Sequence, residues 1–327
     1  LGRIAYHVSN PDHSLGFLKW AYLNFVRENF VGGTTGEQAP KDDVYWNAVK
    51  WGAKGICLVL KDQPSNSNSH YGPYDGVMKP IPGLWIGKYD GIELKEKALN
   101  GSIATLKLDG TITDGTMSNI WCVLPGLSDE IVLVTTHHDA PFKGAVEDGT
   151  GVAQVLAQAK IWSKVPLEKR RRTLIFLVAA GHFYGFQGGH TFAKQHPEIM
   201  KKVKLLITLE HLGAKEVVEK NQEYAETGQL AYTIMFTSPD PLTIATARNA
   251  LRKKPTRATA SIPYTLFADA PLSDAIGYVL ESGTRVISWI GCPYYLLDAQ
   301  DTLDRVAKNE LGPICETITE LIKPYMK

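Results

Sequence analysis

The sequence predicts an α/β protein, a three-layer sandwich in which helices cover both faces of a mixed, mostly parallel sheet. Two observations predict this fold. From residue 119 onward, short apolar runs typical of buried strands alternate with segments whose apolar residues recur at helical spacing. The first strand segment, EIVLVTTHHD at 130–139, opens with a continuous apolar run, as expected for a strand covered on both faces.

The other elements of this region follow in chain order. Residues 151–162 predict a helix whose inward residues are Val152, Val155, Leu156 and Ala159. The later elements are a strand at 173–181, a helix at 188–202, strands at 203–211, 230–238 and 283–291, and a closing helix at 309–326. The closing helix is predicted to bury Ile314, Ile318, Leu321 and Ile322.

The sequence also predicts two domains, residues 1–117 and residues 118–327, with the polar stretch TITDGTMSN at the boundary. The first domain is expected to be small and β-rich with some helix. Its predicted elements are a helical turn leading into a strand within 47–60, a helix with Leu94 and Leu99 facing inward, and a strand alternating at Ala104, Leu106 and Leu108.

Charge and hydropathy exclude some partners. The chain of 327 residues has a formal net charge of +1. This argues against nucleic acid as a partner, because proteins that bind nucleic acid usually present a strongly basic face. The single basic cluster, Lys169–Arg172, is predicted to be a solvated connection. No run reaches the roughly 18 apolar residues of a membrane span. The chain begins with Leu1, and the sequence leaves open both the compartment and whether residues precede it.

The four cysteines are widely spaced and form no CxxC pair. This spacing argues against a disulfide scaffold and against a cysteine-based zinc site. Cys57, Cys122 and Cys315 lie in apolar patterns and are predicted to be core residues.

Polar side chains stand at the ends of three predicted strands. His137, His182 and Glu210 each lie at or just beyond such an end. Ligands of open α/β sheets gather beyond the carboxyl ends of the strands. These three residues are therefore expected to converge on one rim of the sheet.

Several motifs in the same order resemble a known family. They are EIVLVTTHHDA, GAVEDGTGVAQVLAQA, TLIFLVAAGHFYGFQGG, LLITLEHLG, LSDAIGYVLESGTRVIS and YYLLDAQDTLD. Over residues 118–327 the chain resembles the co-catalytic zinc aminopeptidases and carboxypeptidases related to glutamate carboxypeptidase and the transferrin receptor. Residues 1–117 resemble the protease-associated domain often inserted in that family, most clearly at WGAKGICLV. The resemblance implies the zinc-peptidase fold and makes a secreted or membrane-associated compartment one option.

The resemblance carries one metal position over to this chain. His137 and Asp139 match the family's His-x-Asp motif, in which His binds zinc and Asp orients it. The family's bridging Asp, the first residue of an Asp-Asn pair, aligns with Glu147 in EDGTG. A later Asp ligand aligns with Glu210, so His137, Glu147 and Glu210 are expected to bind one divalent metal ion, zinc by resemblance. Asp148 is expected to stabilise the turn before the next helix.

The second metal position of the family lacks its ligands here. A ligand Glu aligns with Phe183 and the last ligand His aligns with Leu297, and neither side chain can bind a cation. His182 replaces the family's general-base Glu and is predicted to act as the acid–base residue. The family's second metal helps to anchor the free amine of peptide substrates, so ordinary aminopeptidase activity is not expected.

The sequence therefore predicts a divergent, single-metal hydrolase acting on an amide, peptide-like or small carbonyl substrate. The residues expected to contact the substrate are Phe183, Tyr184, His211, Tyr294, Tyr295 and Leu297. Two alternatives stay open: a non-catalytic binding or scaffold protein of the transferrin-receptor kind, and a metal-free or lyase-type enzyme on the same fold. A homodimer is possible by family resemblance, although the sequence identifies no interface.

Overall fold

The computed structural model describes residues 43–327 except 73, 255, 257–258, 267 and 272, and the predictions that fall on residues 1–42 lie outside this part. The chain forms two compact units. The smaller comprises residues up to 113 together with 220–223, and the larger comprises 114–219 and 224–327.

The described part of the smaller unit contains two helices and a two-stranded parallel sheet. Its elements are α3 (Val44–Lys50), β1 (Ile56–Leu60), β2 (Gly83–Gly87) and α4 (Lys88–Leu99). The predicted inward position of Leu99 is wrong, because its side chain is 78% exposed at the end of α4. The strand predicted at Ala104–Leu108 is also wrong, because this stretch has no regular secondary structure and pairs with no strand among the described residues. Only Leu106 within it is half-buried, and the other residues are exposed.

The larger unit is built on a seven-stranded sheet with the order β10-β9-β11-β6-β4-β5-β3. The strands are β3 (Ile120–Leu124), β4 (Ser128–His137), β5 (Arg172–Ala179), β6 (Val203–Glu210), β9 (Thr233–Thr237), β10 (Thr259–Pro263) and β11 (Val286–Gly291). The pairs β3–β5 and β9–β11 are antiparallel, and the other pairs are parallel. This confirms the predicted mixed, mostly parallel sheet.

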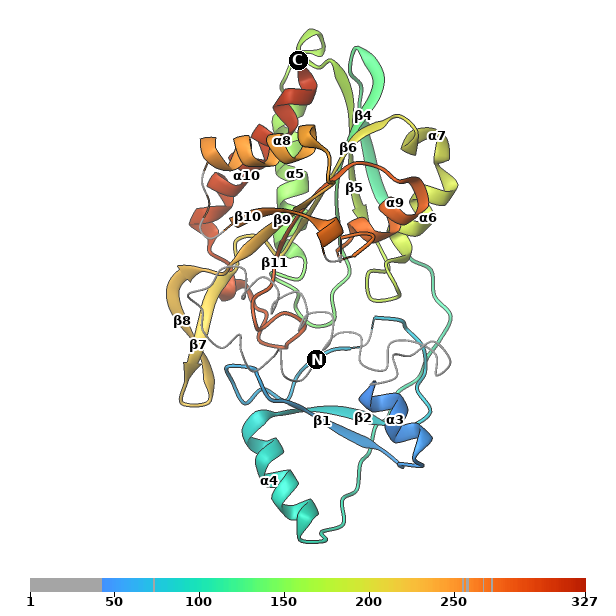
Figure 1. Ribbon diagram of the computed structural model, residues 1–327, viewed down its shortest axis with the longest axis vertical. Helices are drawn as coiled ribbons and strands as arrows, with labels where there is room; N and C mark the ends of the chain where they lie inside the picture. Colours follow the sequence, from blue (N-terminus) through green and yellow to red (C-terminus); the bar gives the residue numbers. More distant parts are fainter. Residues whose placement is uncertain (1–42, 73, 255, 257–258, 267, 272) are drawn as a thin grey trace. The chain divides into compact units, whose positions relative to one another are not determined.

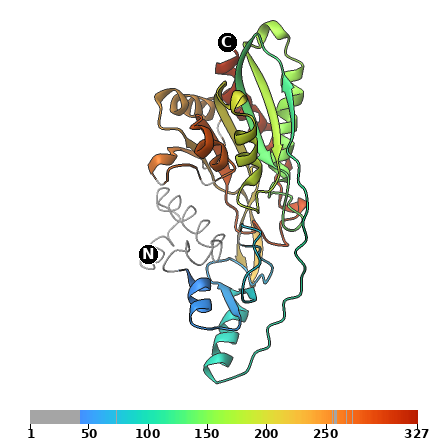
Figure 2. The same ribbon diagram turned by 90° about the vertical axis from the view of Figure 1, so that its right-hand side faces the viewer.

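Helices cover both faces of this sheet (Figure 1, Figure 2). One face carries α5 (Gly149–Ser163), α8 (Pro241–Lys253) and α10 (Leu311–Ile322); the other carries α6 (Gln187–Gln195), α7 (Pro197–Met200) and α9 (Ala275–Ser282). Successive strand residues alternate between the two cores, as Val132 and Val134 do against Leu133. The result is the predicted three-layer sandwich. The predicted inward residues of α10 are confirmed, since all four are at most 3% exposed.

The predicted inward face of α5 is partly wrong. Leu156 is 61% exposed, whereas Gln154 and Gln158 are buried. The two glutamines donate hydrogen bonds from their amides to the carbonyl oxygens of Leu311 and Cys315 on α10, at 3.0 and 2.8 Å. A buried amide costs little when it is hydrogen-bonded, so polar residues tie these two helices together.

Further differences concern breaks and short elements. The helix predicted at 188–202 is divided at Pro197, which cannot donate to the preceding turn, into α6 and α7. The sequence did not predict five elements: the hairpin strands β7 (Lys215–Lys220) and β8 (Glu223–Leu230), the helices α8 and α9, and the strand β10. Short 3₁₀ helices lie at Leu167–Lys169, Tyr264–Leu266, Leu303–Arg305, Lys308–Glu310 and Lys323–Met326.

Two predictions about polar and sulfur-containing side chains are also wrong. Cys57 and Cys122 are exposed and Cys315 is half-buried, because their strands and helix leave one face uncovered at these positions. In the basic cluster Arg170 is buried, and its guanidinium donates to the carbonyl oxygens of Pro125 and Val165. Among the described residues, none of the helices has the length and apolar character needed to cross a membrane.

Candidate metal centre

Three neighbouring parallel strands bring the predicted polar residues to one edge of the sheet. His137 is the last residue of β4 and Glu210 the last of β6, while His182 follows the end of β5 by three residues. Because β4 pairs with both β5 and β6, these strand ends are adjacent. All three side chains are buried, at 0 to 2% exposure.

The donor atoms at this edge fall into two groups that share His137. One group consists of His137, Glu147 and His211, and the other of His137, His182, Glu210 and Asp274. In each group, ligand-type atoms lie within 4.8 Å of one another. The predicted trio of His137, Glu147 and Glu210 is therefore divided between the groups.

The first group converges on the Glu147 carboxylate. The Nε2 atom of His211 lies 2.7 Å from Glu147 Oε2, and Nε2 of His137 lies 3.4 Å from Glu147 Oε1. The other nitrogen of each imidazole, Nδ1, contacts a main-chain carbonyl oxygen. His137 Nδ1 lies 2.9 Å from the Asp139 carbonyl, and His211 Nδ1 lies 2.8 Å from the Gly291 carbonyl. The orienting contact of His137 is thus the Asp139 carbonyl, while the Asp139 carboxylate lies farther away, at 3.7 Å.

The second group is linked internally. His182 Nδ1 lies 2.7 Å from the Asp274 carboxylate, and the Asp274 main-chain amide donates to Glu210 Oε1 at 3.0 Å. The His182 ring stacks on His137 with a centroid distance of 3.8 Å. His182 is therefore in contact with both groups.

Burial and mutual charge shift the acidity of these groups. Burial would raise the pKa of Glu147, but the His211 and His137 imidazoles outweigh it and hold that pKa well below its usual value. Burial would lower the pKa of His211, yet the Glu147 carboxylate raises it to about 10. Burial and the neighbouring Asp274 raise the pKa of Glu210 well above its usual value. The two groups together contain three imidazoles and three carboxyl groups, and their pKa values are shifted in opposite directions by burial and by one another.

Several buried donor atoms of the cluster form no hydrogen bond with the described residues. They are His137 Nε2, His211 Nε2, both carboxylate oxygens of Glu147, Glu210 Oε2 and Asp274 Oδ2. Each buried polar atom left without a hydrogen bond costs about 1–3 kcal/mol. Imidazole nitrogens and carboxylate oxygens are the ligands of catalytic zinc sites, so this set of residues fits a divalent cation.

Asp148 and Asp301 fix the segment that carries Glu147. The Asp301 carboxylate accepts hydrogen bonds from the main-chain amides of Val146 and Glu147, each at 2.9 Å. The Asp148 side chain accepts from Gly151 at the start of α5, which confirms the expected stabilisation of that turn.

Comparison with known proteins agrees with this fold. Residues 119–259 match the model of Peptidase family M28. The aminopeptidase from Aneurinibacillus sp. strain AM-1 superposes with a TM-score of 0.60 and 19% identity, covering 87% of this chain and 66% of that one. The zinc aminopeptidase BSAP from Bacillus subtilis gives 0.63 and 19%, covering 86% and 66%. No curated protein sequence matches the chain.

The chain fits the zinc-peptidase superfamily. A peptidase M28 precursor from Shewanella amazonensis SB2B superposes similarly, with a TM-score of 0.61 and 20% identity over 84% of this chain and 61% of that one. The γ-secretase component nicastrin also shares the fold, with a TM-score of 0.52 and 12% identity over 84% and 61%. The chain spans less than two thirds of the length of each of these structures.

Within the zinc-peptidase fold, the predicted substrate contacts occupy different environments. Phe183 and Leu297 are buried, and the Phe183 ring packs edge-on against His182 at 4.8 Å. Tyr184 is 49% exposed, and Tyr294 is half-buried. Tyr295 is buried, and its hydroxyl donates to the Lys215 carbonyl at 2.8 Å. His211 lies inside the cluster itself.

His211 and Asp274 were not predicted as members of the metal centre. Strict alternation along β6 would turn His211 away from the side of Glu210. Its backbone instead adopts a left-handed conformation, φ 59°, which no sequence pattern reveals. Asp274 precedes α9, an element that was itself not predicted. The sequence offered one indication for each residue: His211 follows the end of a strand, and Asp274 precedes the start of a helix.

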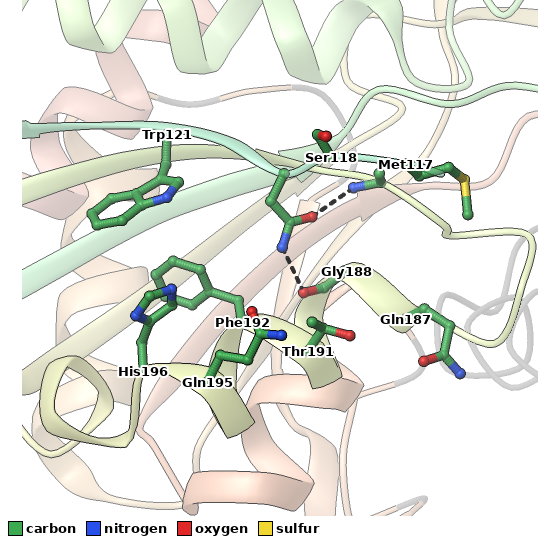
Figure 3. A pocket seen from close by; sticks show the side chains of 11 residues that line it. Met117, Ser118, Trp121, Gln187, Gly188, Thr191, Phe192, Gln195 and His196 are labelled. Carbon is green, nitrogen blue, oxygen red and sulfur yellow. Dashed lines mark hydrogen bonds between the residues drawn. The ribbon is translucent and has the colours of Figure 1, made fainter. Parts of the chain in front are cut away.

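A surface cavity of about 430 Å³ lies between β3 and α6 of the same unit. It is lined by Met117, Ser118, Asn119, Trp121, Ala180, Gln187, Gly188, Thr191, Phe192, Gln195 and His196 (Figure 3). The Asn119 side chain accepts from the Ala180 amide at 3.0 Å and donates to the Gly188 carbonyl at 2.9 Å. These two bonds hold both ends of the segment that carries His182.

Replacing Asn119 with alanine is expected to lower the free energy of unfolding by about 1 kcal/mol, because two hydrogen bonds to partly covered main-chain groups are lost. Urea denaturation followed by circular dichroism measures the change. Ser118→Ala on the neighbouring exposed position is the matched control and should leave the midpoint unchanged. Equal midpoints for Asn119→Ala and the control would show that Asn119 does not brace the segment.

Proposed function

We propose that the protein is a metal-dependent hydrolase that cleaves an amide or peptide-like bond with one divalent cation, zinc being the first candidate. The observation that carries this proposal is the convergence of buried imidazole and carboxylate atoms that form no hydrogen bond. The zinc aminopeptidases with the same fold support hydrolysis as the reaction class. The family match over residues 119–259 supports it as well.

The two groups of donor atoms share one residue, His137, and this favours a single cation. The Nδ1 atom of His137 is engaged by the Asp139 carbonyl, so only Nε2 remains as a ligand. One imidazole lone pair binds one cation. Phe183 and Leu297 support the same conclusion, because both positions that resemble ligands of a second metal carry buried apolar side chains.

When bound, the cation would polarise the scissile carbonyl and lower the pKa of a water molecule. His182 would move the proton. Burial and the neighbouring His137 lower the pKa of His182, which favours its neutral form. With Nδ1 directed at Asp274, the Nε2 atom lies 3.8 Å from Glu147 Oε1 and faces the cluster. A neutral imidazole in this orientation can accept a proton from water and pass it to the leaving group.

The substrate is proposed to lack a free N-terminal amine. In the family that the sequence resembles, the second metal helps to anchor that amine, and this chain has Phe183 beside His182 instead. An apolar side chain disfavours a charged ammonium group at this place. N-acylated peptides or small amides are thus better candidates than peptides with a free N-terminus.

Metal removal tests the proposal. The purified protein should contain one equivalent of metal by elemental analysis and should hydrolyse members of a panel of N-acyl amides. Dialysis against a chelator should abolish this hydrolysis, and Zn²⁺ should restore it. Hydrolysis that persists without metal would instead support a metal-free enzyme. Stoichiometric metal with no turnover on N-blocked or free peptides would support a binding or scaffold protein.

A further inference from the structure

We propose that the divalent cation is held by His137, Glu147 and His211, and that Glu210 belongs to the proton-transfer network of His182 and Asp274. This inference rests on the proposed function and deepens it. It assigns a ligand, His211, that the resemblance to zinc peptidases does not supply.

The hydrogen bonds of the two histidines fix their tautomers. A main-chain carbonyl oxygen can only accept, so the Nδ1 atoms of His137 and His211 carry protons that they donate to Asp139 and Gly291. With Nδ1 engaged in this way, Nε2 is the nitrogen of each ring that can release its proton and bind the cation. Histidines that bind metals nearly always donate their other N–H in this way, commonly to a main-chain carbonyl.

Both Nε2 atoms face the same carboxylate. They lie 2.7 and 3.4 Å from the Glu147 oxygens, and all three side chains are at most 1% exposed. Neither nitrogen nor either oxygen forms a hydrogen bond with the described residues. Two imidazoles and one glutamate form the protein ligand set of several catalytic zinc sites, and that set leaves a coordination position for water.

The backbone at His211 is strained in a way that serves this arrangement. Its φ of 59° lies in the left-handed region, which costs a residue with a side chain free energy and persists only where the surroundings enforce it. The Asp148 side chain accepts a hydrogen bond from the His211 main-chain amide at 3.0 Å. A Cβ at Gly291 would lie 2.6 Å from the His211 carbonyl oxygen, so only glycine permits this close approach. Strain at a buried imidazole whose Nε2 faces a buried carboxylate points to a functional ligand.

Glu210 is bound differently. Its Oε1 accepts the hydrogen bond from the Asp274 amide, and Asp274 in turn holds His182. Hydrogen bonds through Asp274 therefore link the second group, whereas the first group is joined by the ion pairs of His211 and His137 with Glu147. Glu210 and Glu147 do not occur together in either group of donors. The geometry thus separates a binding trio from a linked network that orients the acid–base histidine.

Binding of Zn²⁺ and Co²⁺ to the full chain tests this assignment without relying on activity. Competition with a chromogenic chelator should show that His211→Gln weakens Zn²⁺ affinity by at least about 100-fold, the upper end of what even loss of an outer partner costs. Glu210→Gln is the matched control, since its amide oxygen can still accept from Asp274. Its Zn²⁺ affinity should stay near the wild-type value.

X-ray absorption of the wild-type protein loaded with Zn²⁺ gives a readout that needs no variant to fold. Two imidazoles and one carboxylate support the assignment, whereas one imidazole and two carboxylates overturn it. Loss of Zn²⁺ in Glu210→Gln together with retention in His211→Gln also overturns it. Absence of Zn²⁺ binding by the wild-type protein would instead overturn the proposed function itself.

Discussion

Replacing His182 with glutamine is expected to lower kcat by about 10²–10⁴-fold, the range that general acid–base groups contribute, while the bound metal stays at the wild-type level. Glutamine preserves much of the volume of histidine but cannot exchange a proton near neutral pH. The stacked His137 ring and the edges of Phe183 and Phe186 would still enclose the side chain. The loss should therefore lie in kcat, with KM little changed.

His138 supplies the matched control for this substitution. It is the neighbouring histidine, but its side chain is exposed, and its Nε2 contacts the Ser118 carbonyl at 3.1 Å. His138→Gln should retain full activity. Elemental analysis of His182→Gln separates two roles: a variant that loses both metal and activity would make His182 a ligand, and a variant that stays active would exclude it from proton transfer.

The sheet could be predicted from the sequence because its strands are buried on both faces. Runs such as Ile131–Val134 leave little choice of structure once both sides must be covered. The elements that were missed carry weaker patterns. The hairpin Lys215–Leu230 is rich in charged residues and buries only Val217 and Tyr224, and α8 is short of large apolar residues. A start signal did exist for α8, where Asp240 caps the helix and Pro241 opens it.

The sequence could predict the part of the candidate site that lies at the ends of parallel strands. His137, His182 and Glu210 could be placed on one edge because parallel strands end together there. Their partners could not be assigned, because those contacts depend on local backbone geometry and on long-range loops. His211 enters the cluster through a left-handed turn. Asp274 reaches His182 across 92 residues of sequence.

Asp148 illustrates how an acid can act as a neutral structural residue. The Thr136 hydroxyl contacts both the Asp148 carboxyl and the Leu209 carbonyl, the latter at 2.7 Å. A hydroxyl has a single proton, so Thr136 can donate fully to only one of these two oxygens, and a protonated Asp148 would supply the second hydrogen bond. Burial likewise raises the pKa of Asp148 to about 8. Asp148 follows Glu147 as Asn follows Asp in the family that the sequence resembles, and a protonated carboxyl mimics that amide.

Asp148→Ala is therefore expected to lower the free energy of unfolding at about pH 4 by about 3 kcal/mol, since the cap of α5 and the buried bonds to Thr136 and His211 are lost together. Asp148→Asn should stay close to the wild-type value at about pH 4, because its amide can donate to Thr136 while its oxygen accepts from Gly151 and His211. Asp240→Ala removes a comparable helix cap at a half-buried site, so this control should cost only about 1 kcal/mol. Urea denaturation of the chelator-treated proteins measures all three.

The pH dependence of Asp148→Asn distinguishes a neutral Asp148 from an ionised one. The folded-state pKa of about 8 lies above the ordinary value of 3.8, so between these limits the folded protein retains a proton that the unfolded chain releases. This carboxyl group therefore makes the wild-type protein less stable as pH rises from about 4 to 8. Asparagine does not titrate, so the stability difference in favour of Asp148→Asn should widen over this interval. A difference that stays constant, or narrows, would mean that Asp148 is ionised in the folded protein and that Thr136 donates to it alone.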